Sequence, residues 1–207
     1  MPSQFIALAE KSGLIHQHGA TVLRRACEAG VRLGGPFVSV NVSPIQMRRS
    51  DFLKDLKQVL AETGLAPERL TLEITEGALI EDTEAAFSLI QEVRSLGVRV
   101  ALDDFGTGFS SLSYLRRFQL DALKIDRSFI VDLDNGAEAA SILHCMVSLG
   151  RALGLKVVAE GVETAEHARF AQAAGIHLVQ GYHFSQPLGL ADFEARYGRA
   201  QRGRQVA

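Results

Sequence analysis

The sequence contains little of what several classes of protein depend on. Its 207 residues include only two cysteines, Cys27 and Cys145, and this favours a reducing compartment over a disulfide framework. A formal net charge of −2 gives no electrostatic footprint for nucleic acid or a membrane surface. No apolar run approaches the roughly 20 residues of a membrane span. Residues 1–4 lack the basic start and long apolar core of a signal peptide. We therefore expect a cytoplasmic protein.

What the sequence does contain is a regular alternation of strands and helices. Hydrophobic residues make up 47% and charged residues 22%, as in a soluble globular domain with a sizeable core. The expected strands cover residues 37–41, 70–76, 98–102, 122–126, 155–160 and 177–180. The expected helices cover residues 5–30, 52–60, 83–96 after an Asp82 cap, 112–117, 142–153, 164–174 and 190–197. Alternation without a linker predicts one α/β domain of parallel βα units.

Polar side chains stand where each expected strand ends. They are Asn41; Glu73 and Glu76; Asp103 and Asp104; Lys124 and Asp126; Glu160, with Glu163 in the following loop; and Gln180. The strand ends of a parallel barrel meet on one face, where the active sites of such barrels lie, so we expect these side chains on one rim. A complete barrel of this type needs eight strands. Either two strands are missing from this polypeptide, or the sheet is open.

The stretch from Asp103 to Ser111 carries the densest chemistry. Two adjacent aspartates repel each other, and a bound cation is the usual way to offset that repulsion. Gly106 and Gly108 allow the backbone to approach a ligand closely. Taken alone, the stretch also fits an acidic turn between a strand and a helix. A dinucleotide-binding loop fits less well, because two carboxylates stand in front of its glycines.

Seven segments of the chain together resemble a known family, the EAL-domain phosphodiesterases of the bacterial second messenger cyclic di-GMP. The segments are Phe5–Glu10 with Gly13–Ile15, Val40–Pro44, Leu72–Glu76, Asp103–Ser111, Lys124–Phe129, Ala159–Thr164, and Gln180–Tyr182 with Pro187–Leu188. The resemblance implies a modified TIM barrel with about six βα units over residues 1–198 and a basic tail over residues 199–207. It also implies that the first two strands are absent, because no Glu-Ala-Leu tripeptide occurs in the sequence.

The resemblance implies a metal-dependent hydrolase that opens cyclic di-GMP to linear pGpG, with Mg²⁺ or Mn²⁺ in a two-metal site. Asn41, Glu73 and Asp103 would bind the first metal, and Asp104 would reach the second. Lys124 would hold the attacking water or a phosphate oxygen, and Glu160 would be the general base or a metal-site carboxylate. Glu76 would brace the loop that follows Asp104. Three further residues would contact and orient the site residues rather than bind the metal: Asp126, Glu163 and Gln180.

The same resemblance implies partners beyond the substrate. The loop that follows Asp104 would contribute to the substrate site or to a homodimer; its residues are Phe105, Gly106, Thr107, Gly108, Phe109, Ser110 and Ser111. A sensor or GGDEF-type domain would precede this chain in a longer protein. Without the Glu-Ala-Leu carboxylate, we expect this chain alone to bind metal poorly and to turn over cyclic di-GMP slowly or not at all.

Three other functions stay open from the sequence. A module that keeps the fold and binds cyclic di-GMP or a protein without hydrolysis would explain the absent Glu-Ala-Leu segment, but it would not need so many acidic strand ends. An enolase-like barrel also uses carboxylates and a lysine around Mg²⁺, yet it leaves the Asp-Asp-Phe-Gly-Thr-Gly stretch unexplained. Histidine-based zinc chemistry lacks any H-E-x-x-H spacing.

Overall fold

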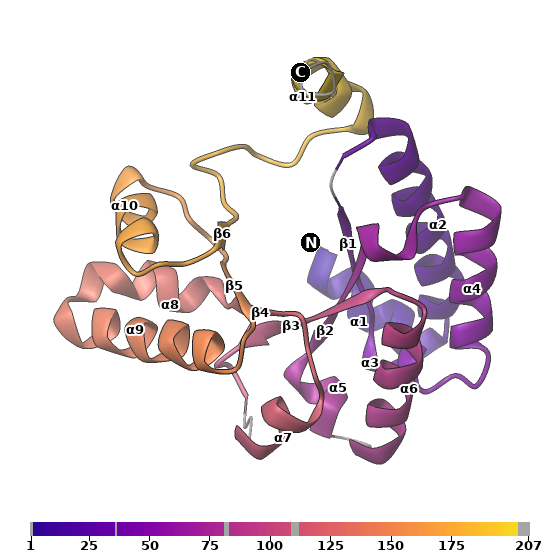
Figure 1. Cartoon of the computed structure of the whole chain (residues 1–207), viewed down its shortest axis with the longest axis horizontal. Helices are drawn as coiled ribbons and strands as arrows, with labels where there is room; N and C mark the ends of the chain where they lie inside the picture. Colours follow the sequence, from indigo (N-terminus) through magenta and orange to yellow (C-terminus); the bar gives the residue numbers. More distant parts are fainter. Residues whose placement is uncertain (1, 36, 81–82, 109–111, 203–207) are drawn as a thin grey trace. The chain divides into compact units, whose positions relative to one another are not determined.

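The computed structural model describes residues 2–35, 37–80, 83–108 and 112–202 (Figure 1). The chain forms two compact units, and each is described by itself. The first comprises Met1–Ile74, Glu81–Arg99 and Leu188–Ala207. The second comprises Thr75–Ile80 and Val100–Pro187. Among the described helices, none combines the length and apolar character needed to cross a membrane.

The first unit consists of two parallel strands and the helices that surround them. The strands are β1 (Val38–Asn41) and β2 (Leu70–Thr75, whose last residue belongs to the second unit), and they pair in parallel. The helices are α1 (Pro2–Ser12), α2 (Ile15–Leu33), α3 (Pro44–Met47), α4 (Phe52–Thr63), the 3₁₀ turn η1 (Pro67–Arg69), α6 (Thr83–Ser95) and α11 (Leu190–Arg202). In this register Asn41 lies opposite Glu73, so two predicted ligands are neighbours on adjacent strands.

Helices α2 and α4 lie side by side in the first unit (Figure 1) and bury one apolar face each. Leu23 and Cys27 of α2 and Leu56 and Val59 of α4 are buried, at the helical spacing that places them on one face. Glycine decides where the first helix ends: Gly13 has a φ of +76°, a left-handed conformation that glycine adopts without steric strain. The helix predicted over residues 5–30 is therefore two helices, α1 and α2.

The second unit is a sheet of four parallel strands with helices between them. Its strands are β3 (Arg99–Phe105, whose first residue belongs to the first unit), β4 (Ala122–Ile125), β5 (Lys156–Ala159) and β6 (Leu178–Val179). They are ordered as in the chain, and each is parallel to its neighbour. The helices are α5 (Glu76–Ile80), α7 (Leu112–Arg117), α8 (Arg127–Val131), the 3₁₀ turn η2 (Asp132–Asn135), α9 (Ala137–Ala152) and α10 (Ala165–Ala173).

Apolar strands and one glycine bring helix α9 close to this sheet. Leu123 of β4 and Val157 of β5 are fully buried. A Cβ placed on Gly150 of α9 would lie only 2.6 Å from Val157 Cγ2, so the missing side chain allows the close approach of helix and strand. Strands that are buried in this way match the apolar pattern of parallel sheets covered by helices.

All six expected strands are present, but five of their polar ends lie differently from the prediction. Glu160 and Gln180 directly follow β5 and β6, whereas the expected strands included them. Glu76 is the first residue of α5 rather than the end of β2. Asp103 and Asp104 lie inside β3 rather than after it. Asp126 follows β4 and caps α8, because its side chain accepts a hydrogen bond from the Ser128 amide. The Asp82 cap and residues Phe109, Ser110 and Ser111 lie outside the described residues.

Candidate functional site

A bulge in β3 determines where Asp103 and Asp104 lie. Leu102 pairs with Leu123 and Phe105 pairs with Ile125, so the two aspartates stand opposite the single residue Lys124. Asp104 has a φ of +54°, in the left-handed region that few residues other than glycine, asparagine and aspartate adopt. In a regular strand, consecutive side chains point to opposite faces. A bulge re-aims one of them, and this allows neighbouring carboxylates to converge.

Three carboxylates of the second unit do converge. Oxygen atoms of Asp103, Asp104 and Glu160 all lie within 4.8 Å of one another. Asp103 and Asp104 come from the bulged end of β3, while Glu160 directly follows β5. The Glu160 amide donates a hydrogen bond to the Ile125 carbonyl (3.1 Å), which fixes the start of its loop against β4. The sequence predicted that these strand ends would meet, and here they do.

Lys124 places a buried positive charge among these carboxylates. Its side chain is 6% exposed, and Nζ lies 3.0 Å from Asp103 Oδ1 and 2.6 Å from Glu160 Oε1. A buried ammonium is costly unless it is paired, and here it has two carboxylate partners. Lys124 therefore joins the end of β3 to the loop after β5.

The negative charge of the cluster still exceeds this one cation. Burial raises the pKa of the Asp104 carboxyl above its ordinary value, and the charges of Asp103 and Asp126 raise it further, although Lys124 acts in the opposite direction. An excess of closely spaced carboxylates is the donor set that hard divalent cations prefer. The described residues therefore fit Mg²⁺ or Mn²⁺ better than a metal that prefers nitrogen or sulfur.

The turn after Asp104 is held by Glu76, a buried carboxylate from the start of α5. The Gly106 amide donates a 3.0 Å hydrogen bond to Glu76 Oε1. A Cβ on Gly108 would lie 2.5 Å from Glu76 Oε2, so glycine at this position lets the turn pass close to that carboxylate. Thr107 bonds back to the Asp104 carbonyl through both its amide and its hydroxyl. The predicted brace is thus a direct contact between Glu76 and the turn.

Three further predicted residues lie around the cluster with partners of their own. Asp126 accepts a 3.0 Å hydrogen bond from the Ser128 amide and so caps α8. Glu163 pairs with Arg127, with 2.9 Å between Oε1 and Nη2. Gln180 has an exposed side chain, and its backbone connects β5 to the following loop by donating to the Ala159 carbonyl and accepting from the Val162 amide.

The remaining two predicted ligands, Asn41 and Glu73, belong to the first unit. They lie opposite each other on β1 and β2, and the Val42 amide donates a 2.8 Å hydrogen bond to the Glu73 carbonyl. Glu73 is buried, with 8% of its surface exposed. The structure therefore brings the predicted set together in two groups, one within each unit.

Sequence reasoning assigned no role to Arg127, which holds Glu163. Two sequence features could have pointed to a role for Arg127. It is a cation directly after Asp126, and the loop that contains Glu160 and Glu163 also contains a glycine, Gly161. Neither residue identifies the other from the sequence, because the Arg127 side chain lies against Gly161 only when β4 and β5 pair in their observed register.

Comparison with known proteins identifies close relatives. The family model described as "EAL domain" matches residues 1–187. The cyclic di-GMP phosphodiesterase NbdA of Pseudomonas aeruginosa is 43% identical over 198 residues, which cover 93% of this chain and 25% of NbdA. This chain covers only 23% of the first two curated relatives, so it spans about a quarter of such proteins.

Two solved structures extend the comparison to the fold. The PaMucR phosphodiesterase in complex with c-di-GMP matches with a TM-score of 0.89 and 38% identity, covering 93% of this chain and 80% of that one. The manganese/cy-diGMP complex of BlrP1 from Klebsiella pneumoniae matches with a TM-score of 0.76 and 32% identity, covering 83% and 45%. This likeness confirms the predicted α/β fold of incomplete TIM-barrel type.

Proposed function

The chain belongs to the EAL domain family. We propose that it hydrolyses one phosphodiester bond of cyclic di-GMP to give linear pGpG. The observation that carries the proposal is the carboxylate cluster of Asp103, Asp104 and Glu160 around the buried Lys124. A relative that is 43% identical over 93% of the chain is named as a cyclic di-GMP phosphodiesterase, which supports the same substrate here.

The cluster is proposed to hold Mg²⁺ or Mn²⁺ through Asp103 and Asp104. The family resemblance adds Asn41 and Glu73 of the first unit as further predicted ligands. When bound, such cations supply positive charge that stabilises the negative charge developing on the phosphate and lowers the pKa of water. The oxygen-only donor set supports this assignment, and a manganese complex exists for the related BlrP1.

Glu160 is proposed as the general base of the reaction. It accepts the proton of the attacking water as the new P–O bond forms and the bond from phosphorus to the ribose 3′ oxygen breaks. That oxygen takes a proton from solvent as it leaves and becomes a free 3′ hydroxyl, and the phosphate stays on the 5′ side, as in pGpG. Lys124 fixes the Glu160 carboxylate in place through its 2.6 Å contact. A base acts within hydrogen-bond reach of the proton that it takes, so this fixed orientation matters.

Chromatography of the products formed from cyclic di-GMP with Mn²⁺ tests the proposal. We expect pGpG from the wild-type chain and at least about a hundredfold less from Glu160→Gln, because the amide cannot accept the proton. Nucleotide binding should change little, since it rests on many other contacts. Glu166→Gln is the matched control, because this exposed carboxylate lies in α10 and pairs with Arg169.

Two outcomes would change the assignment. Near-normal turnover by Glu160→Gln would exclude Glu160 as the base. Tight binding of cyclic di-GMP by the wild-type chain with no product would support the receptor alternative instead. A homodimer through the turn after Asp104, an upstream sensor or GGDEF-type domain and a cytoplasmic location stay predictions.

A further inference from the structure

The loop between β5 and α10 carries Glu160 at its start and Glu163 at its end, and a cation holds each of them. We propose that Arg127, at the start of α8, is a positioning residue that fixes this loop and so orients Glu160. The functional consequence rests on the proposed role of Glu160 as the base. The structural consequence does not rest on that role, because it concerns only how firmly the backbone of residues 160–163 is held.

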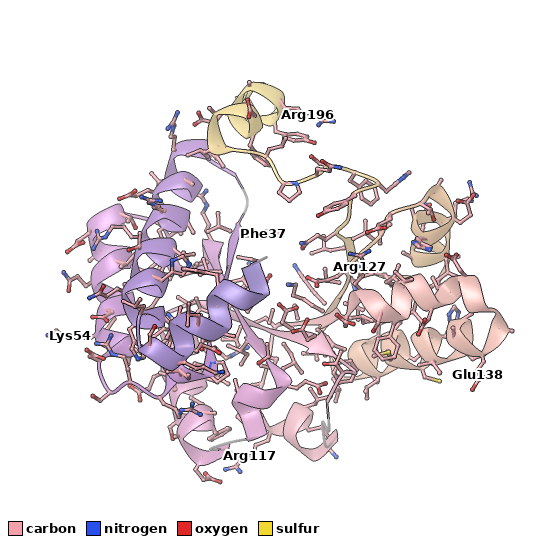
Figure 2. All side chains as sticks on the ribbon, turned by 180° about the vertical axis from the view of Figure 1, so that it is seen from behind. Phe37, Lys54, Arg117, Arg127, Glu138 and Arg196 are labelled. Carbon is pink, nitrogen blue, oxygen red and sulfur yellow. The ribbon has the colours of Figure 1, made fainter. Side chains whose placement is uncertain are left out.

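Two cations that lie close together in the chain hold the two ends of this loop. Lys124 Nζ lies 2.6 Å from Glu160 Oε1, and Arg127 Nη2 lies 2.9 Å from Glu163 Oε1. Lys124 comes from β4, and Arg127 is the first residue of the helix that follows it. Figure 2 labels Arg127 among the side chains of the whole molecule. Both ends of the acidic loop are therefore tied to one short segment.

The stem of Arg127 also covers the residue next to Glu160. Gly161 has a φ of +71°, which an L-residue other than glycine adopts only with strain. A Cβ on Gly161 would lie 2.2 Å from Arg127 Cγ and 2.7 Å from its Cβ. The methylene groups of Arg127 thus occupy the space that a side chain at this position would need.

Gly161 is the flexible residue of this loop, because backbone hydrogen bonds anchor its neighbours on both sides. The Glu160 amide is bonded to the Ile125 carbonyl, and the Val162 amide is bonded to the Gln180 carbonyl. Val162 is fully buried as well. Between these anchors, glycine leaves the backbone more conformational freedom than any other residue would. Contact with the Arg127 stem restricts that freedom next to the proposed base.

This arrangement contributes little to folding stability. The side chains of Arg127 and Glu163 are 59% and 34% exposed, and exposed ion pairs add little to the stability of a fold. Its effect is expected on geometry, where a small displacement of a catalytic group lowers the rate strongly. The proposal therefore predicts lower turnover without a matching loss of stability.

The test compares Arg127→Ala with Arg127→Lys and with the matched control Arg169→Ala. Arg169 is an exposed arginine of α10 that pairs with Glu166 rather than with Glu160 or Glu163. Amide hydrogen exchange of residues 160–163 is the first readout, because it needs no turnover. We expect exchange to be about fivefold faster in Arg127→Ala, partly restored in Arg127→Lys and unchanged in Arg169→Ala.

Turnover of cyclic di-GMP is the second readout. In Arg127→Ala, kcat should fall about tenfold with KM unchanged and with the melting temperature within about 3 °C of wild type. Unchanged exchange at residues 160–163 in Arg127→Ala would overturn the proposal. Faster exchange across the whole second unit with a large fall in melting temperature would overturn it too. A wild-type chain without turnover would refute the proposed function, and the exchange result would still decide this inference.

Discussion

At the scale of single residues, Asp104 combines an unfavourable backbone conformation with an unfavourable charge environment. Its backbone is left-handed, with a φ of +54°. Its carboxyl has a raised pKa, first because it is partly buried and then because Asp103 and Asp126 lie near. Strain and charge crowding of this kind persist where function requires them. Asp104 is therefore expected to lower the stability of the metal-free fold while it serves the site.

Replacing Asp104 with asparagine should stabilise the metal-free protein. Asparagine tolerates the left-handed backbone and removes the crowded charge. Because the folded-state pKa of Asp104 is raised, its charged form destabilises the fold above that pKa, and the penalty disappears as the pH falls through it. We expect Asp104→Asn to melt about 2–4 °C above wild type at pH 7. The gain should shrink on acidification.

Thermal melts of both proteins without metal, from pH 7 downward, measure this difference. Glu92→Gln is the control, since this carboxylate is exposed on α6. A melting temperature of Asp104→Asn below that of wild type at neutral pH would show that the carboxylate stabilises the metal-free fold.

At the scale of elements, the turn after β3 depends on the close approach of glycine to Glu76. Gly108→Ala would place a Cβ 2.5 Å from Glu76 Oε2 and displace the carboxylate that accepts the Gly106 amide. Gly108 itself is exposed, so the cost comes from the buried Glu76 losing its hydrogen bond with the Gly106 amide, about 1 kcal/mol. We therefore expect a melting temperature lower by about 2–4 °C and a lower kcat.

Gly77→Ala is the matched control for this prediction. Gly77 lies in α5 directly after Glu76, and a Cβ there meets nothing within 4 Å. Alanine favours a helix by up to about 1 kcal/mol relative to glycine, so this variant should melt at the same temperature as wild type or slightly higher. Equal melting temperatures for Gly108→Ala and wild type would contradict the described contact with Glu76.

Elements also show how far the sequence determines the site. The apolar runs predicted all six strands, and the polar strand ends predicted that Asp103, Lys124 and Glu160 would meet. The bulge at Asp103 and Asp104 could not be read from the sequence, because it depends on the register of β3 against β4. The sequence does not predict the contact of Arg127 with Gly161 for the same reason, since the two segments meet only in the folded sheet.

At the scale of the whole molecule, the chain is an EAL domain segment that covers about a quarter of its first curated relatives. Its predicted ligands lie in two groups, with Asn41 and Glu73 in the first unit and the carboxylate cluster in the second. The carboxylate cluster is expected to bind a divalent cation. Cation binding underlies the proposed hydrolysis, and it can be measured without any substrate.

Titration of the chain with Mn²⁺, followed by the electron paramagnetic resonance signal of the free ion, measures this binding. Asp103→Asn removes one charged oxygen donor from the cluster, and the affinity of hard-cation sites depends on ligand charge. We predict that wild type binds Mn²⁺ at least about tenfold more tightly than Asp103→Asn, and that the exposed control Asp134→Asn binds as wild type does. Equal affinities of wild type and Asp103→Asn would show that the chain does not bind the cation through Asp103.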